Sequence, residues 1–164
     1  MRRFVERALA KLPRLNEEQM RSLLYALAEE NGRMDAALES MLDGIVVCDR
    51  EHLPIIYNKS AERMLRLGGP DPAERPLWMS VQDEDLSDFL RDTLEGEETV
   101  LDREFGLETT GSTRLVAVSI SPLVSRGRIE GAIVHMEDIT EKRRKEAQLR
   151  RAESLASLTT LAAG

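Results

Sequence analysis

The sequence is poor in the residue types on which many binding and redox functions depend. It contains one cysteine, two histidines, three phenylalanines, two tyrosines and one tryptophan in 164 residues. A single cysteine, Cys48, excludes an intramolecular disulfide. The histidines are too few and too scattered to form a metal cluster with it. With so few aromatic side chains, the chain is poorly supplied for a pocket in which a planar cofactor could stack.

Long apolar runs and an excess of basic charge are also missing. No apolar stretch approaches the roughly 20 residues that span a bilayer, and the segment Met1–Phe4 is not followed by the apolar core of a signal peptide. The net charge is -7, with a pI of about 5.0, whereas nucleic-acid binding requires a basic surface. We therefore expect a protein of the reducing cytoplasm, with no membrane span and no nucleic-acid partner.

Catalytic patterns are absent as well. There is no glycine-rich phosphate loop followed by lysine, and no nucleophile can be paired with a base from the sequence. Acidic pairs such as Asp83 and Asp85 are typical of the first turn of a helix. We expect no catalytic residue and no metal ligand, so this chain by itself is predicted not to be an enzyme.

The most informative stretch is the C-terminal part of the chain, 128–164. Apolar and polar residues alternate from Arg128 to Asp138, which indicates a strand. Good helix formers begin at Glu141, and Asp138 is placed to act as an N-cap with Glu141 three residues later. No flexible linker separates the two elements. We call Asp138, Ile139 and Thr140 the signal junction, because a disturbance of the strand would pass through them to the helix.

The predicted outgoing helix is locally basic. Its positive residues are Lys142, Arg143, Arg144, Lys145, Arg150 and Arg151. The simplest interpretation is a solvated helix face, and the alternative is a docking surface for a nucleic acid or a membrane. Two heptad registers compete along this helix, one through Leu149 and the other through Leu155.

The N-terminal part predicts a short helix from Arg3 to Leu12 and a longer helix capped by Asn16. In the longer helix, apolar residues recur at alternating spacings of four and three. This N-terminal seam consists of Met20, Leu24, Leu27, Asn31, Met34, Leu38 and Met41. A polar residue such as Asn31 at an a position fixes the register of a two-stranded coiled coil. The seam therefore predicts a homodimer, and the alternative is an amphipathic helix packed on its own domain.

The middle of the chain predicts an α+β domain. Strands are expected at 45–49, 53–57, 99–107, 114–124 and 128–138, and helices at 59–67 and between Ser80 and Gly96. Asn58 and Ser80 are expected to cap these two helices, and Leu77 and Trp78 to fill the core. Pro54 indicates an edge strand, because proline cannot donate to a sheet ladder. The order favours a five-stranded antiparallel sheet with a helical lid on one face, flanked by N- and C-terminal coiled-coil helices.

The segments Leu42–Asp49 and Tyr57–Leu65, followed by Ser119–Leu123 and the Asp138-Ile139-Thr140 motif, resemble the beginning and the end of a PAS domain. The resemblance runs from about Glu39 to Glu141. It implies a sheet with a lid over a cleft, and a role in sensing or in dimerisation.

The tail 152–164 resembles the start of the dimerisation helix of histidine kinases, which leads into a phosphoacceptor histidine. No histidine follows His135, so the resemblance implies a sensor fragment that is cut before that residue. The implied regions are a dimerisation segment (1–38), a PAS domain (39–140) and an outgoing helix (141–164). The implied partners are a second copy, kinase domains and a response regulator in a bacterial two-component phosphorelay. The alternatives are a ligand-free dimerisation module and a PAS sensor for a nucleotide cyclase or a transcription activator.

The resemblance does not identify a cofactor. Haem-binding members often carry an axial histidine in the helix that here runs from Glu84 to Leu94, and this helix has none. The photoactive flavin-binding subfamily has an Asn-Cys pair at a helix start, whereas Lys59 follows Asn58 here. We predict no cofactor and a structural role for His135, with ligand binding or pH sensing as the alternative. A small-molecule ligand in the cleft is the remaining option, with Ser119, Ser121, Tyr57 and Arg103 as candidate contacts.

Overall fold

A computed structural model describes residues 16–67, 71–109 and 111–164. The chain divides into two units, one ending at Ser40 and the other beginning at Met41. The predicted helix from Arg3 to Leu12 lies outside the described residues.

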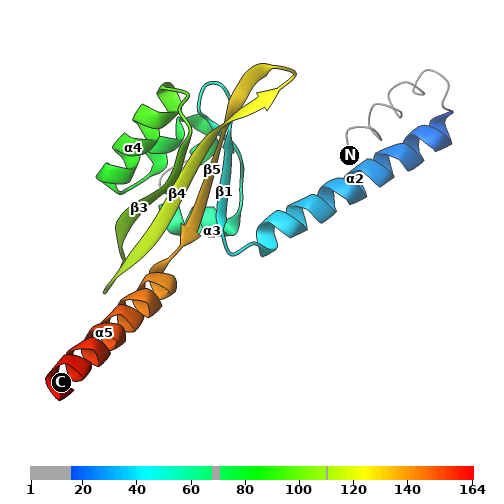
Figure 1. The fold of residues 1–164 in the computed structure, drawn as a ribbon. Coiled ribbons are helices and arrows are strands. Elements are labelled where there is room, and N and C mark those ends of the chain that lie inside the picture. Colours follow the sequence, from blue (N-terminus) through cyan, green and yellow to red (C-terminus); the bar gives the residue numbers. More distant parts are fainter. Residues whose placement is uncertain (1–15, 68–70, 110) are drawn as a thin grey trace. The chain divides into compact units, whose positions relative to one another are not determined.

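The first unit contains one described helix, α2 (Glu17–Ser40) (Figure 1). Asn16 caps it as predicted: its side-chain Oδ1 accepts from the backbone N–H of Gln19 at 2.8 Å, and the Gln19 side chain accepts from the Asn16 N–H at 3.1 Å. This reciprocal arrangement satisfies two N–H groups that the helix leaves without a partner.

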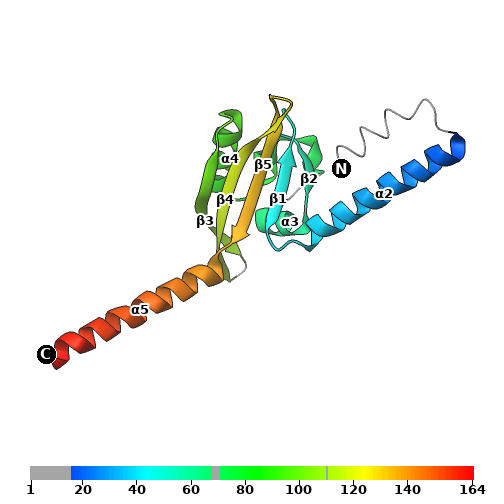
Figure 2. The same ribbon diagram turned by 45° about the vertical axis from the view of Figure 1, so that its right-hand side comes forward.

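The second unit contains a sheet, a lid and an outgoing helix. Its strands are β1 (Gly44–Cys48), β2 (Pro54–Tyr57), β3 (Val100–Thr109), β4 (Ser112–Ser125) and β5 (Arg128–Asp138), and its helices are α3 (Lys59–Leu65), η2 (Pro72–Glu74), η3 (Leu77–Ser80), α4 (Glu84–Glu95) and α5 (Thr140–Ala163). The lid consists of the segments between β2 and β3 (Figure 2).

The five strands form one antiparallel sheet in the order β2-β1-β5-β4-β3. β5 is the central strand, although it comes last in the sequence. Pro54 lies in β2 at the edge of the sheet, as predicted, because an edge strand does not need its N–H for a second ladder. The predicted fold class, an α+β fold with a five-stranded antiparallel sheet and a helical lid, is confirmed.

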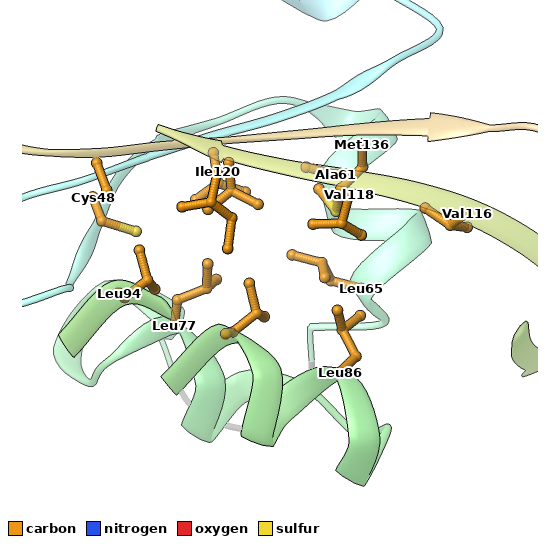
Figure 3. Packing of buried hydrophobic residues seen from close by; sticks show 14 of the residues in the cluster. Cys48, Ala61, Leu65, Leu77, Leu86, Leu94, Val116, Val118, Ile120 and Met136 are labelled. Atoms are coloured by element: carbon orange, nitrogen blue, oxygen red, sulfur yellow. The ribbon is translucent and has the colours of Figure 1, made fainter. Parts of the chain in front are cut away.

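The hydrophobic core lies between the sheet and the lid. The register pairs Val134 of β5 with Val46 of β1 and with Ile120 of β4, and all three side chains are almost fully buried. Figure 3 shows such sheet residues facing apolar side chains of the lid, including Leu77 and Leu86. The alternation of apolar residues along these strands therefore identified the inner face correctly.

Glycine is required where β5 passes the end of β1. Gly131 has φ 152°, and a Cβ atom added there would lie 1.9 Å from the carbonyl oxygen of Cys48. Any side chain would displace one of the two strands. The position therefore keeps the start of β5 in close contact with β1.

The two α-helices of the lid are capped by side chains, in one case by a different residue from the one predicted. Asn58 Oδ1 accepts from the Ala61 N–H at the start of α3, as expected. At α4 the cap is Asp83, which accepts from the Leu86 N–H at 2.9 Å. The prediction of Ser80 as this cap is wrong, because Ser80 ends η3 and its hydroxyl accepts from Arg75 Nε.

Candidate signalling junction

The signal junction is short and held by side-chain hydrogen bonds. β5 ends at Asp138 and α5 begins at Thr140, so Ile139 alone separates strand from helix. Asp138 Oδ1 accepts from the backbone N–H of Thr140 at 3.0 Å and from its hydroxyl at 2.6 Å. The prediction of Asp138 as the N-cap is wrong in position: Ile139 occupies the cap, and the Asp138 carboxylate binds the first helical residue from one position further back.

The junction is also attached to β4 through Leu115. The Ile139 N–H donates to the Leu115 carbonyl at 2.9 Å, and the Thr140 hydroxyl accepts from the Leu115 N–H at 3.0 Å. The Thr140 hydroxyl therefore donates to Asp138 while it accepts from β4, and Ile139 is buried. Because these bonds use both strands and the first helical residue, a shift of β5 against β4 must change the start of α5.

A third attachment joins α5 to β3. The Arg143 guanidinium binds the Glu104 carboxylate of β3 and, at 2.6 Å, that of Glu146 one turn further along α5. The two hydrogen-bonded carboxylates raise the pKa of Arg143, and the Arg143 hydrogen bond lowers the pKa of Glu146. Both shifts favour the charged forms of Arg143 and Glu146.

On the incoming side, the segment before β1 is held by buried polar side chains. Asn58 is buried, and its Nδ2 donates to the Asp43 carbonyl while its Oδ1 accepts from the Ile45 N–H. The Ser60 hydroxyl donates to the Met41 carbonyl at 2.8 Å. The chain that leaves α2 is thus fixed to the start of α3 before it enters the sheet.

His135 links this incoming segment to the central strand. Its Nε2 lies 2.9 Å from Asp43 Oδ2 on the face of β5 away from the lid, and both side chains are partly exposed. His135 therefore lies on the opposite face of β5 from the buried Val134 and Met136. Its structural partner, Asp43, lies only three residues after the end of α2.

The N-terminal seam lies on α2 except for its last member. No residue of α2 is buried, and Met20, Leu24 and Met34 are 38%, 63% and 46% exposed. Met41 lies one residue beyond the end of the helix at Ser40 and is 46% exposed. Leu27 and Leu38 of the seam are partly buried, and the other seam residues of this unit are exposed.

Buried apolar side chains of the lid and the sheet form one cluster between the two layers (Figure 3). One hollow, of about 110 Å³, opens between the end of α4 and the sheet and is lined in part by His52, Thr93 and Ala132. Another, of about 240 Å³, opens beside Arg66 and Asp83. Both are smaller than the roughly 300–1,000 Å³ of typical small-molecule sites.

The residues suggested as cleft contacts do not gather at these hollows. Ser119 and Ser121 alternate with the inward-facing Val118 and Ile120, so they point to the opposite face of the sheet. Ser119 Oγ instead accepts from the Asp102 N–H at 3.0 Å. Among the described residues, no group of three or more histidine, cysteine or acidic side chains is arranged to hold a metal ion.

Sequence reasoning missed two contacts. Arg143 and Glu104 are 39 positions apart, and His135 and Asp43 are 92 positions apart. Neither pair has a local sequence signal, because each depends on the order of strands in the sheet. To predict these contacts, one would have to know that β1 and β3 lie on either side of the β5–β4 pair.

The family model described as the PAS fold matches residues 38–144, well over half of the chain. The chain belongs to the PAS fold family. This PAS domain contains the sheet, the lid and the signal junction, and the match continues into the first turn of α5.

The chain is similar in sequence to a histidine kinase. The signal transduction histidine-protein kinase AtoS of Escherichia coli (strain K12) is 28% identical over 153 residues, which cover 90% of this chain and 24% of AtoS. The chain thus spans about a quarter of the length of AtoS. In the part of this chain that the structure describes, the helices are too short or too polar to cross a bilayer.

Solved structures show the same fold. The PAS domain of Bordetella pertussis BvgS is 19% identical, with a TM-score of 0.52, over 77% of this chain and 98% of that one. The PAS domain of an HTR-like protein from Haloarcula marismortui is 21% identical, with a TM-score of 0.52, over 73% and 99%.

Proposed function

We propose that this chain is the sensory PAS module of a cytoplasmic two-component histidine kinase, and that it relays a signal through Asp138, Ile139 and Thr140 to α5. The observation that carries the proposal is the attachment of the start of α5 to β5, β4 and β3 at once. The similarity to AtoS supports the kinase context, because it spans 153 residues and so extends beyond the family match at 38–144.

In this proposal the chain has three parts. Residues 1–38 form a dimerisation segment, 39–140 the PAS domain and 141–164 an outgoing helix that begins the kinase dimerisation helix. α5 supports the assignment, because it has no buried residue and exposes Leu149, Leu155, Leu158 and Leu161. The functional partners are a second copy, the kinase domains of the parent protein and a response regulator.

The relay works by differential stability of two helix arrangements. A signal that binds or distorts the lid and sheet can shift α5 only as far as it favours one arrangement over the other. The signal junction makes this coupling direct, since Asp138 binds Thr140 and Thr140 binds Leu115. Neither the Asp138 carboxylate nor the Thr140 hydroxyl can move alone without loss of a hydrogen bond.

The test is the Asp138→Ala substitution in the full-length kinase. Loss of the carboxylate removes both hydrogen bonds to Thr140, and we expect basal or stimulated autophosphorylation to change by about five-fold, the effect of losing roughly 1 kcal/mol at a helix start. The measurement is radiolabelled phosphate incorporation with and without stimulus.

Asp88→Ala is the matched control, because Asp88 is an exposed acid that pairs with Arg91 within the same helix. Unchanged basal and stimulated rates in Asp138→Ala would remove the proposed relay.

A second candidate function is a ligand-free dimerisation module, and the packed cleft favours it. Buried side chains of the lid and the sheet form one cluster between the two layers, and the hollows beside it measure about 110 and 240 Å³. In this case the domain would hold two kinase chains in register, and the input would be a partner protein or the geometry of α2.

A further inference from the structure

β3 presents neighbouring side chains to opposite faces of the sheet. Phe105 pairs in register with Val116 of β4, which is buried on the lid side, and Glu104 pairs with Ala117. Successive residues of a strand point in opposite directions. Phe105 therefore faces the lid, and Glu104 faces the side on which α5 begins.

On the lid side, Phe105 contacts α4. The rings of Phe89 and Phe105 have centroids 5.0 Å apart at an interplanar angle of 47°, within the range of favourable aromatic pairs. Both side chains pack against the core cluster. A movement of α4 toward or away from the sheet therefore acts on β3 through this ring pair.

On the other side, Glu104 binds α5. Arg143 reaches Glu104 while its second nitrogen binds Glu146 at 2.6 Å, and its backbone N–H donates to Ile139 within the first turn of α5. The Glu146 contact holds the guanidinium in place, so Arg143 is positioned to bind β3. Arg144, by contrast, pairs with Glu141 inside the helix.

β3 is one of the two edge strands of the sheet. It lies at the edge, with β4 as its sheet neighbour, and its register shifts between Val100 and Arg103. Asp102 has φ 52° at this irregularity. An edge strand with a bulge can tilt with less loss of ladder hydrogen bonds than the central β5.

We propose that β3 is a second link between lid and output helix, in which Phe105 receives the movement of α4 and Glu104 passes it to Arg143. The link deepens the proposed function and rests on it, because it gives α5 an input from the lid in addition to the one through β5. Phe89, Glu104, Phe105 and Arg143 are positioning residues in it. The link can shift the equilibrium between the two arrangements of α5 only if the Glu104–Arg143 pair is closer in one arrangement than in the other.

The test uses hydrogen exchange with mass spectrometry on the chain Met1–Gly164. The variants are Arg143→Gln, Phe89→Leu and the double variant. Arg144→Gln is the matched control, since it removes a helix ion pair that does not reach β3. Exchange of the β1 amides, measured in the same samples, corrects for any change in global stability.

We expect Arg143→Gln to raise exchange at 140–146 by about two- to five-fold, the range for loss of a partly exposed ion pair, and Arg143→Lys to restore most of the protection. Arg144→Gln should change these amides less. Phe89→Leu alone should also raise exchange there, but it should add nothing in the Arg143→Gln background, because the link is already broken.

The proposal is overturned if Arg143→Gln and Arg144→Gln raise exchange at 140–146 equally. It is also overturned if the rise in the double variant equals the product of the rises caused by Phe89→Leu and Arg143→Gln alone. If Phe89→Leu does not fold, Phe105→Leu removes the same contact from the strand side. The readout needs no kinase, so a negative result removes the β3 link and leaves the Asp138 relay to its own test.

Discussion

Cys48 is a buried thiol at the end of β1, with its side chain in the core below the lid (Figure 3). Burial, and to a lesser degree the charge of Asp49, raise the pKa of the thiol from 9.0 to about 12. The thiolate is the nucleophilic form. The structure therefore assigns Cys48 to packing.

The shift predicts a loss of stability at alkaline pH. The unfolded chain releases the Cys48 proton near pH 9, and the folded chain keeps it until about pH 12. The free energy of unfolding is therefore intact below pH 9 and falls above it, by at most about 1.4 kcal/mol per pH unit from this group. Urea titrations at several pH values measure the slope.

Cys48→Ala is the control for this titration, because it keeps other alkaline titrations and removes the thiol. Its unfolding free energy should fall less steeply between pH 9 and 11 than that of the natural chain. Equal slopes would show that Cys48 does not titrate differently on folding.

At the scale of elements, α2 and α5 share a property: neither has a buried residue. Such a helix is only marginally stable when it is surrounded by water, because most helix stability in proteins comes from packing of an apolar face. Leu24 on α2 and Leu155 on α5 are both exposed. We therefore expect each helix to pack against a partner surface. The N-terminal seam offers the more regular spacing.

We predict that α2 drives dimerisation. Sedimentation equilibrium should show a dimer for Met1–Gly164 and at least about ten-fold weaker association for a chain that begins at Ser40, because the shorter chain lacks the seam. Asn31→Leu should strengthen association and loosen the choice of oligomeric state, since the polar a position no longer penalises other registers.

Gly32→Ala is a useful control for the seam. Gly32 is exposed on α2, with nothing within 4 Å of an added Cβ, so alanine should raise helix stability by about 1 kcal/mol without altering the seam.

The sedimentation experiment can also contradict the prediction. Equal association by the long and short chains would place the interface in the sheet or in α5.

At the scale of the molecule, the lid and the sheet enclose a core with little spare volume. The hollows of about 110 and 240 Å³ are below the size that encloses a drug-sized ligand. Native mass spectrometry of the purified chain should therefore show the polypeptide mass without a stoichiometric small molecule. A bound compound retained at one per chain would show that the lid opens, and it would favour ligand sensing over the ligand-free module.

Part of the fold was predictable because its signals are local. The alternation in β5 and the caps at Asn16 and Asn58 depend on residues within a few positions of one another. Ser80 was misassigned because a serine and an aspartate three residues apart are both good caps, and the turn of η3 decides between them. The one-residue error at Asp138 has the same origin, since a carboxylate can bind a helix start from the position before the cap.

The sequence by itself determined the inner face of the sheet, the absence of a disulfide and the direct passage from strand to helix. These follow from the periods of strand and helix and from composition. Only the tertiary structure decided that Arg143 binds Glu104, that His135 binds Asp43, and that the cleft is filled. The reason is physical: such contacts depend on which strands lie side by side and how far side chains reach across them, and no local pattern encodes that distance.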